Sequence, residues 1–177
     1  MGDRARVFFA LWPDQPVRRA LHDVGRRLHQ ALKGRLTRTP SIHLTLLFVG
    51  DVEEGRLDAL RDAASTVTVE PFTMLLDRAA CWRHHRIAWV GPSNPPQALE
   101  GLAMRLRTRT AEAGFAFDRK PFAAHVTLLR DADCAVVVDR IAPVDWDVRE
   151  FVLVRSRLDA AGSRYEVIGR WGGGGEE

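Results

Sequence analysis

The chain has 177 residues, of which 46% are hydrophobic and 28% are charged. This composition is typical of a globular protein with one domain or two small lobes. The sequence contains no apolar stretch long enough to span a bilayer and no basic-then-apolar leader, so we expect a cytoplasmic protein without a membrane partner. The 26 basic residues only slightly outnumber the 23 acidic ones, which does not create the strong positive field expected of a duplex-DNA binder.

The numbers of lysines and cysteines bear on the ligand and on the state of the thiols. Only Lys33 and Lys120 are lysines, and the other basic residues are arginines. Arginine suits bidentate phosphate contacts, but the codon bias of a GC-rich genome explains the same excess, and we place that explanation first. The two cysteines, Cys81 and Cys134, lie far apart and form no disulfide framework, so we expect reduced thiols.

Local patterns predict strands mixed with helices. Residues 7–11 form a strand candidate, and Asp14 and Pro16 are typical of the cap and first turn of a helix that extends to about residue 32. The later predictions are a helix over 53–64, strands over 72–76 and 87–90 joined through 81–85, a helix over 97–113, a strand over 146–156, a hairpin turn at 159–163 and a last strand over 165–171. Residues 135–138 fit either a strand or a short helix, and residues 172–177 are expected to form a flexible tail.

Two short apolar runs carry the same pair of polar side chains. In residues 43–48 the pair is His43 and Thr45, and in residues 125–130 it is His125 and Thr127. Side chains two positions apart leave the same face of a strand, so each histidine shares a face with its threonine. One His-x-Thr pair is an ordinary strand feature, but its repetition in two Leu/Val-rich runs favours a functional site.

If these two strands lie side by side, both imidazoles and both hydroxyls converge on a volume suited to one phosphate. An imidazole donates or accepts a proton near neutral pH, and a threonine hydroxyl donates a hydrogen bond to an anionic oxygen. The set supplies an acid, a base and two anchors without a metal. The spacing of Cys81 and His84 lacks the second ligand pair of a zinc site, so we expect no metal and no cofactor.

The order of elements is also repeated along the chain. A strand, a helix and a lead-in segment precede each His-x-Thr run. We therefore predict an α+β fold of two pseudo-symmetric lobes, each with an antiparallel sheet and helices, and an active-site groove between the lobes. Residues 1–171 are expected to form this single bilobal domain.

The paired motifs resemble those of the 2H phosphoesterase superfamily. The likeness is closest to the bacterial and archaeal RNA 2′,3′-cyclic phosphodiesterases, first described as 2′-5′ RNA ligases, and it covers about residues 6–171. Besides the motifs it is carried by residues 7–11, 82–89, 120–122 and 153–158. Two positions depart from the family's pattern: Ala123-Ala124 stands where Arg-Pro often precedes the second motif, and Gly172 follows Trp171 where proline is common.

The resemblance implies metal-independent hydrolysis of an RNA 2′,3′-cyclic phosphate end to a 2′-phosphomonoester, and we expect a monomer. His43 and His125 are then the acid and the base, while Thr45 and Thr127 hold the non-bridging oxygens. The alternatives are reversible 2′-5′ RNA ligation, opening of a cyclic phosphate on another nucleotide, a metal-dependent phosphodiesterase, and a non-catalytic module that binds RNA ends.

Two further residues of the motif runs are candidates for contact with RNA or a nucleobase. Arg130 ends the second run, and its guanidinium suits a phosphate or the face of a base, with a solvated strand end as the alternative. Phe48 has a ring that can stack on a base, but strict alternation turns it away from His43, so core packing is an alternative of at least equal weight. Other basic residues are candidates for lining an RNA groove, with surface charge as the alternative for each: Arg83, Arg86, Arg119 and Lys120.

Overall fold

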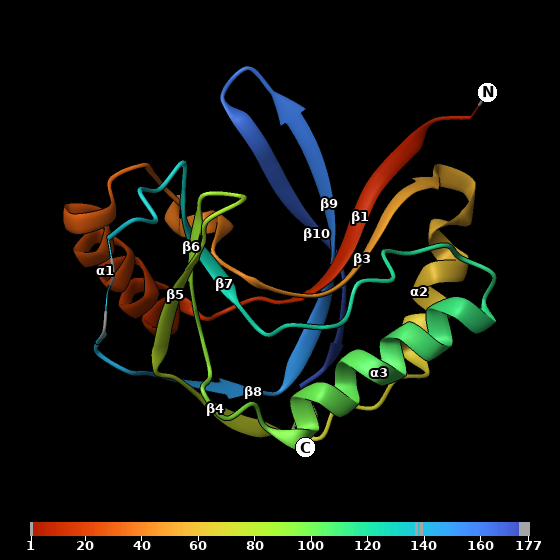
Figure 1. The fold of residues 1–177 in the computed structure, drawn as a ribbon. Coiled ribbons are helices and arrows are strands. Elements are labelled where there is room, and N and C mark those ends of the chain that lie inside the picture. The colour runs from red at the N-terminus through yellow and green to blue at the C-terminus, as the bar shows by residue number, and fades with distance from the viewer. Residues whose placement is uncertain (1, 137, 139, 174–177) are drawn as a thin grey trace.

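The computed structural model describes residues 2–136, 138 and 140–173, and three α-helices and ten β-strands occur among them (Figure 1). The strands are β1 (Arg4–Leu11), β2 (Arg35–Leu36), β3 (Leu44–Glu53), β4 (Phe72–Leu76), β5 (Arg78–Trp82), β6 (Ile87–Gly91), β7 (Val126–Arg130), β8 (Val144–Val148), β9 (Glu150–Asp159) and β10 (Gly162–Gly172). The helices are α1 (Gln15–Leu32), α2 (Leu57–Ser65) and α3 (Gln97–Glu112), with short 3-10 turns at Thr39–Ser41 and Glu54–Arg56.

The strands form one large and one small sheet, and all their pairings are antiparallel. The large sheet has the order β10-β9-β1-β3-β7-β6-β5, with β2 added beside β7, and the small sheet pairs β4 with β8. Strands β3 and β7 meet at the pair Leu44 and Val126, which joins the β10-β9-β1-β3 lobe to the β7-β6-β5 lobe. The predicted α+β fold of two lobes with antiparallel sheets is confirmed.

The helices cover the two lobes in crossed order. Helix α1, from the first half of the chain, lies against β7 of the second lobe, whereas α3, from the second half, lies against β3 of the first lobe (Figure 1). Helix α2 lies against α3 and β10. Each lobe contains a helix from the other half of the sequence, so the repeat visible in the sequence does not correspond to two consecutive lobes, and one hydrophobic core extends through both.

Helix α1 forms where its cap and its apolar spacing predict. The Asp14 carboxylate accepts a hydrogen bond from the Val17 N–H at 3.1 Å. Gly25 lets this helix approach β7 closely, because a Cβ at this position would lie 2.8 Å from Leu36 Cδ1 and 3.6 Å from Leu128 Cβ. The buried stripe that covers the sheet consists of Leu21, Val24, Leu28 and Leu32.

Several boundaries differ from the prediction for local reasons. Strand β5 occupies part of the expected connection, because its pairing with β6 depends on tertiary contacts rather than on an apolar run. The strand expected over 146–156 is two strands, because Arg149 separates the pairing of β8 with β4 from the pairing of β9 with β1. The helix expected from residue 53 begins at Leu57, since β3 continues to Glu53 and a 3-10 turn follows it.

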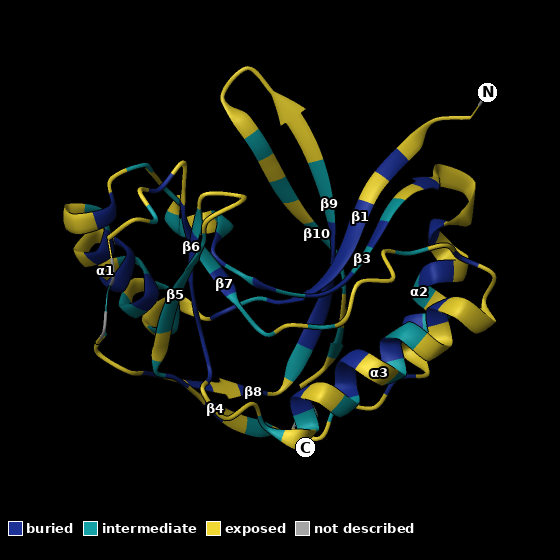
Figure 2. Ribbon diagram, viewed as in Figure 1, coloured by how far each residue is buried: buried dark blue, intermediate teal, exposed yellow. Residues whose placement is uncertain are grey.

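Burial distinguishes a packed centre from an exposed hairpin (Figure 2). Leu44 and Val126 are fully buried where the two lobes meet, whereas residues 157–162 at the end of the β9-β10 hairpin are exposed. Within 131–143 the described residues form no helix or strand, and residue 137 of the undecided stretch 135–138 lies outside the described part, as does residue 139. Gly172 belongs to β10 rather than to the expected tail, and residues 174–177 also lie outside the described part.

The expectation of reduced thiols is wrong, because a disulfide joins Cys81 in β5 to Cys134 after β7. Their Cα atoms are 5.5 Å apart. The segment after β7 returns over the β5-β6 hairpin, where the Ala132 N–H donates to the Arg86 carbonyl at 2.9 Å. Tertiary structure creates this approach, so sequence separation alone did not reveal it.

Candidate active site

The two motif strands bring both polar pairs to one face of the large sheet. Leu44 in β3 pairs antiparallel with Val126 in β7, and both side chains are fully buried on the opposite face. Continuing this register by one residue in each direction puts each histidine opposite the threonine of the other motif. The two facing pairs are His43 with Thr127 and Thr45 with His125.

Each imidazole is oriented by a backbone carbonyl two residues before it. His43 Nδ1 lies 2.7 Å from the Ser41 oxygen, and His125 Nδ1 lies 2.7 Å from the Ala123 oxygen. A carbonyl only accepts, so Nδ1 carries the hydrogen in both neutral rings and Nε2 is left as the acceptor. In His43 this Nε2 is 3.1 Å from the Thr45 hydroxyl, which donates to it. Because a backbone carbonyl orients His125, the alanine at position 123 leaves this contact intact.

A β-bulge follows the threonine in both motif strands. Leu46 is the extra residue where β3 pairs with β1, and Leu128 is the extra residue where β7 pairs with β6. Alternation therefore shifts by one residue, so that two consecutive leucines are buried in each strand: Leu46 with Leu47, and Leu128 with Leu129. The two strands carry the same irregularity at the same distance from their histidines.

The bulges return Phe48 and Arg130 to the face that carries the histidines. Phe48 packs in a small cluster with Phe8 and lines the groove beside Thr45, so the expectation that strict alternation turns it away from His43 is wrong. Arg130 is exposed at the end of β7. The bulge rather than the alternation of an ideal strand decides the direction of both side chains.

Aromatic rings surround His43. Trp12 stacks on the imidazole with 5.2 Å between ring centroids and an interplanar angle of 13°, while Phe8 and Tyr165 lie 5.0 and 5.2 Å away. Burial in this apolar setting penalises the charged form and lowers the pKa of His43 to about 4. In the substrate-free protein this imidazole is therefore neutral at pH 7.

Two tryptophans lie beside His125. Trp82 meets its ring edge-on with 4.6 Å between centroids, and Trp89 lies 6.2 Å away. Burial lowers the pKa of His125, and the positive charge of Arg130 acts in the same direction. Arg130 also lowers the pKa of His43, so its charge reaches both imidazoles. An anion bound among these groups would reverse the effect, because negative charge stabilises an imidazolium.

A groove of about 1060 Å³ extends from the motifs toward α3. Thr45, Phe48 and His125 line it, and His43 reaches it through its hydrogen bond with the Thr45 hydroxyl. The β5-β6 hairpin and the segment before β7 add further lining. The charged and aromatic side chains that line the groove from the hairpin, from this segment and from α3 include Trp82, Arg83, Glu100, Arg107, Lys120 and Phe122. Cations interleaved with rings suit a ligand that carries both phosphates and bases.

The basic residues proposed for the groove divide into two pairs. Arg83 and Lys120 line it. Arg86 instead donates to backbone carbonyls after β7, and Arg119 lies over the ring of Phe117 at 5.3 Å. The guanidinium groups of Arg86 and Arg119 are thus engaged elsewhere in the fold.

Sequence reasoning missed the aromatic residues around the imidazoles. Three of the five tryptophans, Trp12, Trp82 and Trp89, lie beside a motif histidine, and the single tyrosine, Tyr165, also contacts His43. The available signal was position, since Trp12 directly follows the strand expected over residues 7–11. The contact of Tyr165 depends on the long-range pairing of β9 with β1 and carried no local signal.

Two observations concern metals and membranes. Within the described part of the chain, no three or more His, Cys, Asp or Glu side chains gather where they could hold a metal ion, and Cys81 is engaged in the disulfide. In the same residues no helix has the length and apolar character needed to cross a membrane.

The fold and the facing His-x-Thr strands define a phosphoesterase. The chain belongs to the LigT-like phosphoesterase family, whose model matches residues 11–89 and again residues 90–165. The double match agrees with the internal repeat predicted from the sequence.

Similar proteins include two named RNA 2′,3′-cyclic phosphodiesterase. The protein from Escherichia coli K12 is 33% identical over 97% of this chain and 98% of its own length. The protein from Archaeoglobus fulgidus is 26% identical, over 92% of this chain and 97% of its own. A crystal structure of E. coli LigT complexed with 3′-AMP superposes with a TM-score of 0.87 at 32% identity, covering 96% of this chain and 98% of that one.

The lowered pKa of His43 predicts a pH dependence of stability. The unfolded imidazole titrates near 6.5, so between about pH 4 and pH 6.5 the unfolded chain binds more protons than the folded one. The stabilisation is present above pH 6.5 and is lost as the pH falls to about 4, a change of about 3 kcal/mol. We expect urea unfolding from pH 7 to pH 4 to show this loss in the wild type and in the control H22Q, but not in H43Q. Equal pH slopes in the wild type and H43Q would contradict the assignment.

Proposed function

We propose that the protein hydrolyses the 2′,3′-cyclic phosphate at an RNA end to a 2′-phosphomonoester, using two histidines and no metal. The observation that carries this proposal is the register around Leu44 and Val126, which puts each imidazole opposite the hydroxyl of the other motif. The names of the similar proteins support the substrate class. The E. coli structure with 3′-AMP supports the presence of a nucleotide in a groove of this kind.

A phosphate between the facing pairs meets complementary groups on all sides. The hydroxyls of Thr45 and Thr127 donate to its non-bridging oxygens, where negative charge grows in the transition state. One imidazolium protonates the departing 3′ oxygen, and the other imidazole, neutral, takes a proton from water that attacks from the opposite side. The carbonyl bonds at Nδ1 direct Nε2 of each histidine to this proton transfer.

In this mechanism His43 is the acid and His125 is the base. Because His43 is neutral in the free protein, its protonation must accompany binding of the anionic phosphodiester, whose charge raises the pKa of a buried imidazole beside it. Arg130 adds a positive charge that both imidazoles sense. Phe48 offers its ring to the terminal base.

The groove has a volume of about 1060 Å³, and Arg83 and Lys120 line it. We infer that these cations contact phosphates upstream of the cyclic end. The protein acts in this scheme as a cytoplasmic monomer, with residues 1–171 as one domain.

The direct test is to incubate the purified protein with an oligonucleotide that ends in a 2′,3′-cyclic phosphate, in the presence of a chelator. We expect a 2′-phosphomonoester, and we expect H43A and H125A each to lower kcat by about 10²- to 10⁴-fold, while the control H22A on α1 keeps wild-type turnover. A 3′-phosphomonoester, loss of activity in the chelator, joined RNA ends as the main product or binding without turnover would each reject the proposal in favour of a different reaction.

The imidazole pKa values predict the pH profile of kcat/KM, which reports ionisation of the free enzyme. Activity requires one protonated and one neutral imidazole, and both pKa values lie below the ordinary 6.5. We expect a bell-shaped profile with its maximum below about pH 6.5, and a tenfold fall per pH unit at higher pH. A profile that is flat from pH 5 to pH 8 would show that no proton is required on either imidazole.

Arg130 should influence both binding and titration. Replacing it in R130Q removes a positive charge from beside the histidines, so the pKa values of His43 and His125 should both rise. We expect nuclear magnetic resonance titration to show this rise, and we expect KM for the cyclic-phosphate oligonucleotide to increase about tenfold, the effect of losing one charge-assisted contact. The control R26Q, on the exposed face of α1, should change neither quantity. Wild-type titration curves in R130Q would refute the electrostatic role.

A further inference from the structure

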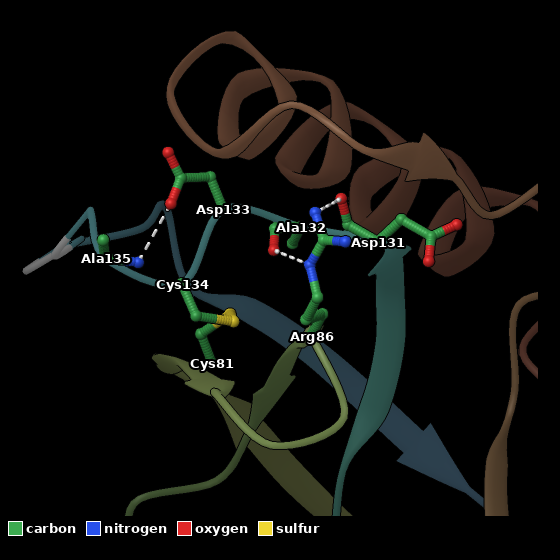
Figure 3. Close-up of a disulfide and its surroundings, with 7 residues drawn as sticks. All are labelled: Cys81, Arg86, Asp131, Ala132, Asp133, Cys134 and Ala135. Carbon is green, nitrogen blue, oxygen red and sulfur yellow. Dashed lines mark hydrogen bonds between the residues drawn. A yellow bond between two sulfur atoms is a disulfide. The ribbon is translucent and has the colours of Figure 1, made fainter.

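A disulfide joins the β5-β6 hairpin to the segment that follows β7 (Figure 3). Cys81 belongs to β5, the edge strand of the large sheet, which pairs only with β6 among the described strands. Cys134 belongs to the segment that follows β7, the strand of the second motif. The bond is therefore a second attachment of the edge strand, and it links that strand to the continuation of β7.

Trp82, the residue after Cys81, connects the disulfide-bonded strand with the candidate active site. Cys81 and Trp82 are consecutive in β5, so their side chains leave opposite faces of the strand. Cys81 packs against the main core, whereas Trp82 lines the groove with His125. The Trp82 ring meets His125 at 4.6 Å and Trp89 at 5.3 Å. The position of the edge strand thus determines how Trp82 covers His125.

A second contact holds the turn of the same hairpin independently of sulfur chemistry. Arg86 Nε donates to the Ala132 carbonyl at 3.3 Å, and another guanidinium nitrogen donates to the Asp131 carbonyl at 3.2 Å (Figure 3). This contact remains when the disulfide is opened, so reduction frees β5 at the position of Cys81 and leaves its turn attached. The expected change is a looser Trp82, not an unfolded lobe.

The sulfur atoms are placed for exchange with a thiol. Both cysteines are half-buried. A hollow of about 440 Å³ beside Cys134 is lined by Arg83, Arg86 and Asp133, so two cationic side chains face one carboxylate there. Guanidinium groups next to a cysteine favour its thiolate, the form that leaves and returns in exchange. In a reducing compartment a disulfide of this kind is opened and re-formed rather than permanent.

We propose that Cys81 and Cys134 form a reversible thiol–disulfide site that reacts with a dithiol, and that its oxidised state holds Trp82 against His125 and so supports turnover. The effect on turnover rests on the proposed function. A thiolate of the dithiol attacks the sulfur of Cys134, the S–S bond breaks, and Cys81 leaves as a thiolate. The second thiol of the reductant then attacks the reductant sulfur that is bonded to Cys134. This closes a disulfide within the reductant and releases Cys134 as a thiolate. Two electrons and two protons pass from the dithiol to the two cysteines.

The test compares oxidised and reduced protein in two measurements. After treatment with dithiothreitol and confirmation of two free thiols by mass spectrometry, we expect kcat/KM on a cyclic-phosphate oligonucleotide to fall about two- to tenfold, the effect of losing one aromatic contact. The pKa of His125 should rise, because Trp82 no longer excludes water from the imidazole. Re-oxidation should restore both values. The C81S/C134S variant should match the reduced wild type and ignore the reductant.

Two results overturn the inference. One is reduced protein, with both thiols counted, that keeps the kcat/KM and the His125 pKa of the oxidised form. The other is a pair of cysteines that stays reduced when the folded protein is treated with excess oxidised dithiothreitol. If neither redox state cleaves the oligonucleotide, the proposed function fails, and the pKa of His125 alone then decides whether the disulfide acts on the groove.

Discussion

The pairing of Leu44 with Val126 is the constraint on which the site depends. It connects the strands of the two lobes into one sheet, and because it is antiparallel it sets each histidine opposite the threonine of the other motif. Both side chains are fully buried, so the hydrophobic core that stabilises the connection also fixes which face carries the polar groups. A slip of one residue at this point would bury the imidazoles and expose the leucines.

The bulge in each motif strand brings one further side chain to the face that carries the histidine. An ideal strand would turn the residue three positions after the threonine into the core, but the extra leucine returns it to the site, as a ring at Phe48 and as a cation at Arg130. The lobes therefore share geometry and differ in chemistry. One imidazole lies among Phe8, Trp12 and Tyr165, and the other lies beside Trp82 on a hairpin tied by a disulfide. This asymmetry matches a reaction that needs one acid and one base.

Features with a local cause could be predicted from the sequence. The cap at Asp14, the stripe of α1 and the repeated His-x-Thr runs each depend on residues close in the chain, and the structure places them as expected. Features with a distant cause could not. The disulfide, the crossed order of α1 and α3 and the contact of Tyr165 with His43 all depend on which strands become neighbours. The direction of Phe48 was missed because periodicity assumes an unbroken strand, and a bulge leaves no mark in its hydrophobic pattern.

The central claim is that one phosphate contacts both imidazoles at once. Titration of the ¹⁵N-labelled protein with a nucleoside 2′-phosphate, followed by nuclear magnetic resonance of the imidazole nitrogens, tests it most directly. The account predicts that Nε2 of His43 and Nε2 of His125 shift together, with one dissociation constant and one ligand per chain, and that both imidazoles become easier to protonate. A ligand that shifts one histidine and leaves the other unchanged would contradict it.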